Sequence, residues 1–235
     1  GGPYATIGGG YINSAPVAWT TVGGGSINTA SGLYATVGGG HGNSASGPYA
    51  TVSGGGRHDP NDPATGNLAP DRWSSVGGGA GNQAGTNNGN VEDAWGSTVA
   101  GGVVNRAQSV AATVGGGSYN TASNASSTVA GGNSNVASGA YGAVAGGYLN
   151  LASGQNSAVG GGSGNTAGSQ MSTVAGGFTN SADGDFSAVG GGIYNVVSAP
   201  YGTIAGGGFG DLANGNRVTD EGGFVGGGAG NQAGD

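Results

Sequence analysis

One aliphatic residue returns at a fixed interval along this chain and constrains the fold more than any other feature. It is Val or Ile, it occurs fourteen times, and ten of the thirteen intervals are 15 residues; the others are 24, 23 and 21. Gly stands two and three residues after every one of these anchors, and Asn stands six residues after twelve of them. A phase held over so many units indicates a single repeat array over residues 1–235. The anchors are Ile7, Val22, Val37, Val52, Val76, Val99, Val114, Val129, Val144, Val159, Val174, Val189, Ile204 and Val225.

A 15-residue unit is too short for a pair of helices, and its Gly content opposes helix formation. In "YATV", from Tyr34 to Val37, Ala35 and Val37 point to one face of a short strand and the other two residues point to the opposite face. The Gly residues that follow supply a tight turn, and the Asn-x-Ala stretch predicts a second short strand. Two strands and two turns per unit predict an all-β fold, a parallel β-solenoid of about fourteen coils.

In a solenoid each position stacks on its equivalent in the next coil, about 4.8 Å away. The repeat therefore predicts an inward ladder of aliphatic anchors, with companion ladders of Ala in a bore too thin for large side chains. It also predicts an Asn ladder that bonds side chain to side chain or to the turn backbone. Representative ladder residues are Val22, Val37, Val114 and Val129 for the anchors, and Asn28, Asn43, Asn120 and Asn135 for the amides.

Composition argues against several classes of function. The chain carries 61 Gly among 235 residues, no Cys, no Lys and a net charge of −7. Clustered Lys and Arg are needed to bind phosphate backbones, so nucleic acid is not an expected partner. No apolar run approaches the about 18 residues of a membrane span, and no Walker-type loop or catalytic constellation is evident. We therefore expect no membrane insertion within this segment, no enzyme activity and no obligatory cofactor.

Units such as "STVAGGNSNVASGAYGAVAGGYLNLASG", residues 127–154, resemble the head repeats of YadA-like trimeric autotransporter adhesins. Similar arrays occur in phage-type tail fibres. The familiar unit has 14 residues, with Gly directly after the aliphatic residue and Ser where Asn stands here. The resemblance implies homotrimers of left-handed β-rolls with a role in adhesion, exposed on a cell surface or virion.

A thin coil also favours an oligomer on thermodynamic grounds. Each coil offers about one Val and one or two Ala for burial. The free energy gained from this burial is small compared with the loss of backbone conformational entropy, about 1–2 kcal/mol per ordered residue. An aromatic residue stands three before the anchor in eight units, and this ladder is the candidate seam between chains. The alternative is a set of surface aromatics scattered on a rim. The eight are Tyr4, Trp19, Tyr34, Tyr49, Trp73, Tyr141, Phe186 and Tyr201.

Three insertions interrupt the period, near residues 56–73, 85–96 and 210–223, and hold eight of the eleven acidic residues and three of the four Arg. Because the register resumes after each, they are expected to be loops that leave a rigid rod. They either increase solubility or contact a ligand, in which case 56–73 and 86–95 make the principal contacts with a host-surface glycan or protein. The candidate contact residues are Arg57, Arg72, Trp73 and Trp95, although Trp73 also fits the regular aromatic position. Weak candidates for calcium, a hard cation that prefers oxygen ligands, are Asp59, Asn61, Asp62 and Asp211.

Together these features predict a non-enzymatic extracellular fibre or adhesin-head segment, whose first partner is another copy of itself. A self-assembling extracellular filament is the alternative of the same class. Ice binding is a third hypothesis, because Thr precedes the anchor in nine units and small solenoids with Thr ladders bind ice.

Overall fold

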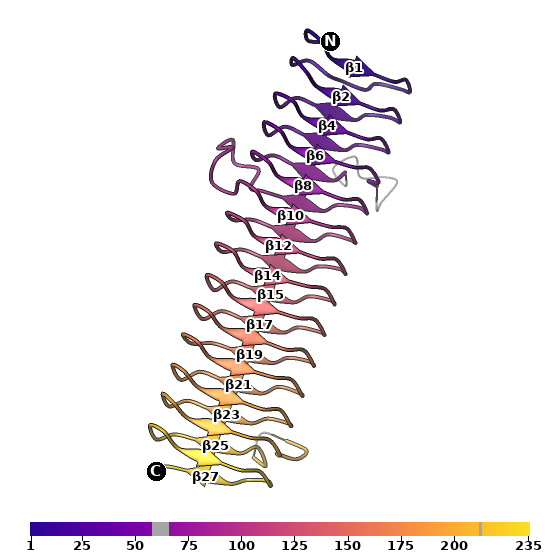
Figure 1. The fold of residues 1–235 in the computed structure, drawn as a ribbon. Helices are drawn as coiled ribbons and strands as arrows, with labels where there is room; N and C mark the ends of the chain where they lie inside the picture. Colours follow the sequence, from indigo (N-terminus) through magenta and orange to yellow (C-terminus); the bar gives the residue numbers. More distant parts are fainter. Residues whose placement is uncertain (58–65, 212) are drawn as a thin grey trace. The chain divides into compact units, whose positions relative to one another are not determined.

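The computed structural model describes residues 1–57, 66–211 and 213–235, and it divides the chain into two compact units, Gly1–Ser126 and Ser127–Asp235. We call them the N-terminal and C-terminal units. Both are built from two-residue β-strands joined by turns (Figure 1), and the described residues contain no helix, hence none able to cross a membrane. The predicted all-β parallel solenoid is confirmed.

The strands of the N-terminal unit are β1 (Thr6–Ile7), β2 (Thr21–Val22), β3 (Thr29–Ala30), β4 (Thr36–Val37), β5 (Ser44–Ala45), β6 (Thr51–Val52), β7 (Leu68–Ala69), β8 (Ser75–Val76), β9 (Gln83–Ala84), β10 (Thr98–Val99), β11 (Arg106–Ala107), β12 (Thr113–Val114) and β13 (Thr121–Ala122). Those of the C-terminal unit are β14 (Thr128–Val129), β15 (Val136–Ala137), β16 (Ala143–Val144), β17 (Leu151–Ala152), β18 (Ala158–Val159), β19 (Thr166–Ala167), β20 (Thr173–Val174), β21 (Ser181–Ala182), β22 (Ala188–Val189), β23 (Val196–Val197), β24 (Thr203–Ile204), β25 (Arg217–Val218), β26 (Phe224–Val225) and β27 (Gln232–Ala233).

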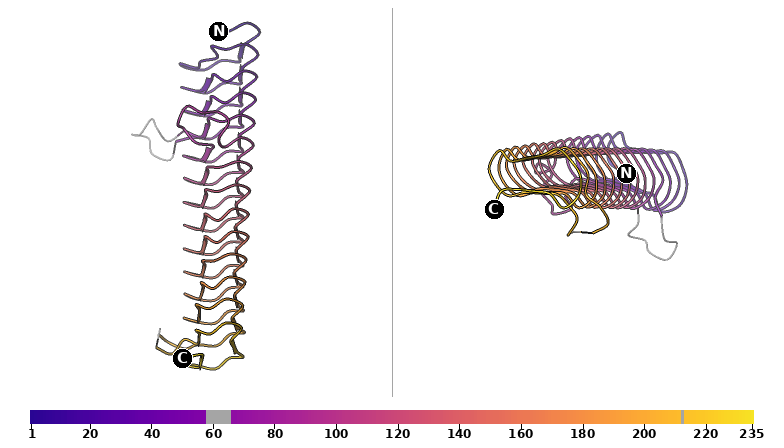
Figure 2. Two further views of the ribbon diagram at one scale, coloured as in Figure 1. Left: turned by 90° about the vertical axis from the view of Figure 1, so that its left-hand side faces the viewer. Right: turned by 90° about the horizontal axis from the view of Figure 1, so that it is seen from below.

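Each coil is a flattened loop with one strand on each long side (Figure 2). In the N-terminal unit the first sheet has the order β1-β2-β4-β6-β8-β10-β12, and the second has the order β3-β5-β7-β9-β11-β13. In the C-terminal unit β14 to β26 and β15 to β27 alternate between two sheets in the same way. Within each unit the paired strands are parallel and join equivalent residues of successive coils, as in Thr36↔Thr51 and Val37↔Val52.

The core is a ladder of single side chains. All fourteen predicted anchors occupy the second residue of a first-sheet strand, and twelve of them are fully buried: Ile204, Val22, Val37, Val52, Val76, Val99, Val114, Val129, Val144, Val159, Val174 and Val189. Ala30, Ala45 and their equivalents in the second sheet, as far as Val218, are equally buried. The expected anchor and Ala ladders are therefore both present.

The Asn ladder is also present, and its bonds run mainly from side chain to backbone. Asn43 is representative: its Oδ1 accepts the backbone N–H of Asn67 at 3.0 Å, and its Nδ2 donates to the carbonyls of Gly39 at 2.8 Å and Gly55 at 2.9 Å. Each amide thus ties its own Gly turn to the next coil, which satisfies groups that burial would otherwise leave unpaired. Asn28, Asn120 and Asn135 take the same position and bond the Gly turn of their own coils.

Two members of the Asn ladder do not stand six residues after an anchor, so the sequence period alone does not identify them. Asn67 and Asn216 lie within the spans expected to be insertions, yet both are fully buried and continue the ladder. Strands β7 and β25 follow them at the regular spacing. The coil therefore resumes by Asn67 and by Asn216, and the ladder passes through both coils that carry these insertions.

Candidate binding surface

The aromatic residues three before the anchor occupy a strained turn. In the third coil the Gly32 carbonyl accepts the Ala35 N–H at 3.0 Å, which places Leu33 and Tyr34 at the centre of a turn. Tyr34 has φ of 60°, the left-handed value that a type II turn requires at this place and that normally selects Gly or Asn. The strand itself is therefore shorter than expected, although the predicted alternation of burial holds: Ala35 and Val37 are buried, Tyr34 is exposed.

Six aromatic rings form a continuous stack in the N-terminal unit. We call this set the aromatic column: Tyr4, Trp19, Tyr34, Tyr49, Trp73 and Trp95. Ring centroids are 4.2 to 6.2 Å apart, and the first three pairs are stacked within 18° of parallel. Each of the six residues is nevertheless 42–74% exposed, and in the three stacked pairs the rings cover each other's faces and leave their edges in solvent. The aromatic column is a continuous row of exposed apolar side chains in the N-terminal unit.

The sixth ring comes from a different turn position. Gly96 occupies the left-handed place in that coil, and the neighbouring Trp95 supplies the ring that contacts Trp73 edge-on at 6.2 Å. Gly at this place shows that the turn itself does not need an aromatic side chain. A bulky residue there costs about 1–2 kcal/mol, which the about 0.5–1.5 kcal/mol of ring stacking roughly offsets. The rings are therefore not explained by the stability of the coil alone.

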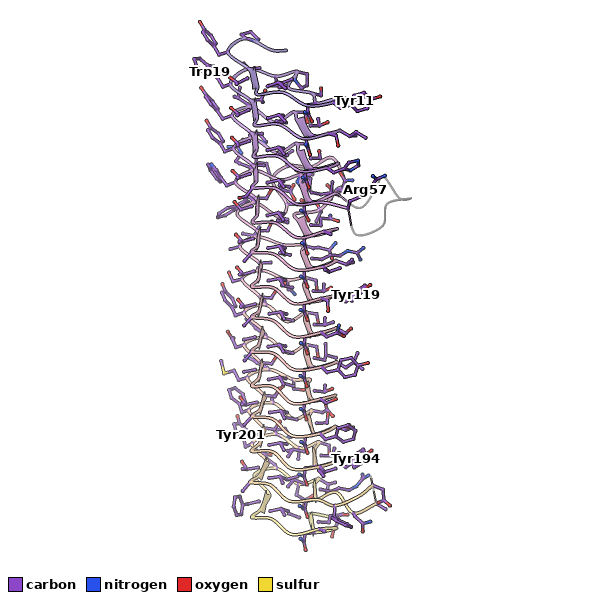
Figure 3. The ribbon with its side chains drawn as sticks, turned by 90° about the vertical axis from the view of Figure 1, so that its right-hand side faces the viewer. Tyr11, Trp19, Arg57, Tyr119, Tyr194 and Tyr201 are labelled. Atoms are coloured by element: carbon purple, nitrogen blue, oxygen red, sulfur yellow. The ribbon has the colours of Figure 1, made fainter. Side chains whose placement is uncertain are left out.

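The opposite side of the unit carries a different set of exposed residues. Figure 3 shows Trp19 on one side of the coils, and Tyr11, Arg57 and Tyr119 on the other. Tyr119 resembles the column residues in backbone, with φ of 57°, and is 53% exposed. Tyr119 therefore serves as a control for the aromatic column, because it has a similar backbone conformation and exposure but lies on the opposite side of the coils.

The four candidate contact residues do not form one site. Arg72, Trp73 and Trp95 lie together: the Arg72 guanidinium carbon is 5.4 Å from the Trp73 ring centroid and its Nη2 is 2.7 Å from Oε1 of Glu92. Arg57 lies on the opposite side (Figure 3). The interpretation of Trp73 as a member of the regular ladder agrees with its stacking partners, so only the first three residues share a surface.

A polar cluster orders the insertion of residues 86–95. The Asp71 Oδ2 accepts the Thr86 N–H at 2.6 Å, while Asp93 accepts the Thr86 hydroxyl at 2.7 Å and the Asn88 amide at 2.5 Å. Asp71 stands where the two preceding coils have Gly32 and Gly47, and its side chain reaches toward the displaced next coil.

The two carboxyl groups of this cluster titrate in opposite directions. Burial raises the pKa of Asp71, the Thr86 N–H partly counteracts this, and the nearby Asp93 and Glu92 charges raise the pKa further. Its Oδ1 is buried with no partner. Hydrogen bonds from Asn88 and Thr86 lower the pKa of Asp93. Ionised Asp71 is therefore unfavourable in the native state, whereas ionised Asp93 is favourable.

We expect the variant Asp71→Asn to unfold at a higher temperature than the wild type at pH 7. A raised native pKa means that the native state is penalised once pH exceeds the unfolded value, and an amide removes this penalty while still accepting the Thr86 N–H. The gain should vanish below about pH 4, where the unfolded carboxyl is protonated. Thermal unfolding across pH checks this, with Asp93→Asn as the control of opposite sign. A loss of stability in Asp71→Asn at pH 7 would contradict the assignment.

The calcium candidates are only partly described. Asp59, Asn61 and Asp62 lie outside the described residues, and Asp211 accepts N–H groups from Ala213 and Asn214 within its own turn. No group of three His, Cys, Asp or Glu suited to a metal ion occurs in residues 1–57, 66–211 and 213–235. Calcium binding at these positions stays a prediction.

The described surface offers no pocket for a small molecule. Comparison of the chain with protein-family models and with curated proteins gave no match. The resemblance to adhesin heads therefore rests on the repeat motif alone, and the function must be argued from the geometry of the coils.

Proposed function

We propose that this chain is a non-enzymatic segment of an extracellular fibre, assembled as a homotrimer on a cell surface or virion, that holds binding surfaces away from the body. The observation that carries the proposal is the continuity of the Asn ladder through the coils with insertions. Asn67 bonds to Asn43 at 3.0 Å although 24 residues separate them, and Asn216 bonds to Asn195 across 21 residues. A scaffold that tolerates loops without losing register suits the display of loops.

The distribution of side chains supports the same proposal. The Val, Ala and Asn side chains of the ladders contact their equivalents in the neighbouring coils, so they are not available to bind a ligand. Large aromatic and charged side chains gather instead at the turns and beside the insertion of residues 86–95. Trp and Arg at such places are typical anchors of contact surfaces.

Excising the insertions tests the adhesive role. Removing residues 58–66 and 87–94 restores 15-residue spacing in both coils, and the same variant carries Arg57→Ser, Arg72→Ser and Trp95→Ser because the excision alone leaves these contact residues in place. We expect the variant to fold with an unchanged ladder. The wild-type chain should bind members of a printed array of glycans and matrix glycoproteins, and the excised variant should lose most of that binding. Thermal unfolding and circular dichroism check that the fold survives.

Each other outcome counts against the proposal. Equal binding by both chains would place adhesion on the repeats, and the insertions would then have no role in recognition. Collapse of the excised chain would show that the insertions belong to the scaffold. A wild-type chain that binds no member of the array would remove the support for an adhesive role.

A further inference from the structure

We infer that the aromatic column is the surface on which a second copy of this chain packs, column against column. The inference rests on the proposal that the chain works as an assembled fibre, and it assigns the contact to particular residues. Four features of the N-terminal unit carry it: which parts of the rings are free, the area they offer, the charge around them and their spacing.

The free parts of the rings are unsuited to a sugar. A carbohydrate stacks on a ring face, but here the faces are turned toward one another, with Tyr4 and Trp19 only 4.2 Å apart and Tyr34 and Tyr49 5.0 Å apart. Along the stacked pairs from Tyr4 to Tyr49, what reaches solvent is mainly ring edges. Edges pack well against other apolar side chains and against aromatic rings, where edge-to-face contact is favourable. A protein surface rich in aromatic residues is therefore the matching partner.

The area is in the range of a real interface. An aromatic side chain offers about 150–250 Å², and the column residues are exposed by 42–74%. Six rings together then present on the order of 600 Å², the upper end of what a monomer usually leaves exposed. Leu33 is also 41% exposed beside Tyr34 and extends the apolar surface. A standard interface needs about 800 Å² per partner, so column and flanking residues approach that value.

Charged side chains are absent from the stretch of chain that carries the first four rings of the aromatic column. Residues 1–56 contain no Asp, Glu, Lys or Arg, although the whole chain has a net charge of −7. Two copies can therefore bring this part of the N-terminal unit together without repulsion between like side-chain charges. At the far end of the column Arg72 is neutralised by Glu92, at 2.7 Å.

Spacing favours a second copy over an unrelated partner. The rings recur once per coil, at the separation of neighbouring strands, about 4.8 Å. Another copy of the chain carries the same period, so each ring that docks brings the next into place. Left-handed backbone at Tyr34, Tyr49 and Trp73 is retained although Gly satisfies the same turn at Gly96. The same position is also left-handed at Ala111, Ser126 and Met171, so the turn does not require an aromatic side chain, and the run of rings has to be explained by what the rings contact.

The test compares three full-length chains by sedimentation velocity. The wild type should be oligomeric at micromolar concentration. The variant Trp19→Ser/Tyr34→Ser/Tyr49→Ser should dissociate at least about 100-fold more readily, because aromatic anchors dominate such contacts. The matched control Tyr11→Ser/Tyr119→Ser removes two rings from the opposite side and should assemble like the wild type. Ser already occupies left-handed positions at Ser126 and Ser134, so the backbone accepts these changes.

A second measurement holds even if the triple variant folds poorly. The chain has no Cys, so Tyr34→Cys and Tyr119→Cys each introduce a single thiol. If the columns pack against each other in register, oxidation should link Tyr34→Cys into covalent dimers and leave Tyr119→Cys monomeric in denaturing electrophoresis. Equal cross-linking of the two variants would overturn the inference.

The remaining outcomes separate this inference from the proposed function. A triple variant that assembles like the wild type overturns the column as the seam and leaves the fibre intact. A wild type that is monomeric at tens of micromolar overturns both the seam and the homotrimer, while adhesion is judged by the excised variant. A monomeric wild type whose binding to the glycan array depends on the three rings would assign the column to a ligand instead.

Discussion

Replacing Gly147 by Ala should destabilise the C-terminal unit by about 3 kcal/mol or more. Gly147 has φ of 90°, and an added Cβ would lie 2.1 Å from the Gly162 carbonyl oxygen and 2.7 Å from Nδ2 of Asn150. That carbonyl belongs to the next coil and accepts both the Tyr148 N–H and the Asn150 amide. The methyl group must therefore push two coils apart or break the Asn ladder.

Gly131 provides the matched control in the neighbouring coil. It also belongs to a Gly turn, but it lies outside the left-handed region and nothing would approach its added Cβ within 4 Å. Gly131→Ala should be neutral or stabilise the fold by up to about 1 kcal/mol, since Ala restricts the unfolded chain. Urea unfolding followed by circular dichroism measures both variants. Similar losses in both would mean that the close approach at Gly147 is not what requires Gly.

The ladders could be predicted from the sequence because the same packing and hydrogen-bonding requirements recur in every coil. An anchor, a small residue and an amide recur at positions where only one kind of side chain fits the bore or satisfies the turn. The period fails only where an insertion separates an anchor from its amide, so a count from the preceding anchor places Asn67 and Asn216 in loops. Counting back from the small apolar residue two places later, Ala69 or Val218, recovers both.

The left-handed turn beneath the aromatic column was not predictable from propensity. Gly or Asn is expected at that place of a type II turn, so Tyr and Trp favoured a longer strand. The available signal was the residue before: Pro3, Pro48 and Pro200 each precede an aromatic residue, and Pro favours the first central place of such a turn.

The candidate contact residues were only partly grouped by sequence. Arg72, Trp73 and Trp95 meet because the insertion begins and ends at the same turn, which places its two ends together. Arg57 leaves its coil from the other turn and therefore lies on the opposite side. The cluster of Asp71, Thr86 and Asp93 occurs once in the chain, so no repeat could reveal its geometry.

The central claim is that every 15-residue unit is one coil templated by its neighbour. Its most direct test inserts a second copy of residues 145–159 after Val159 and measures amide hydrogen exchange. The inserted segment should become one more coil and lengthen the solenoid by about 4.8 Å. The backbone N–H of its Asn should be protected from exchange as in the neighbouring coils.

The control inserts the same 15 residues in scrambled order, which keeps length and composition but moves the anchor, the Gly residues and the Asn out of their repeat positions. We expect that segment to exchange freely as a loop, while the flanking coils stay protected. Protection of the copied segment and exposure of the scrambled one is the predicted result. Equal exchange of the two inserted segments would contradict the account.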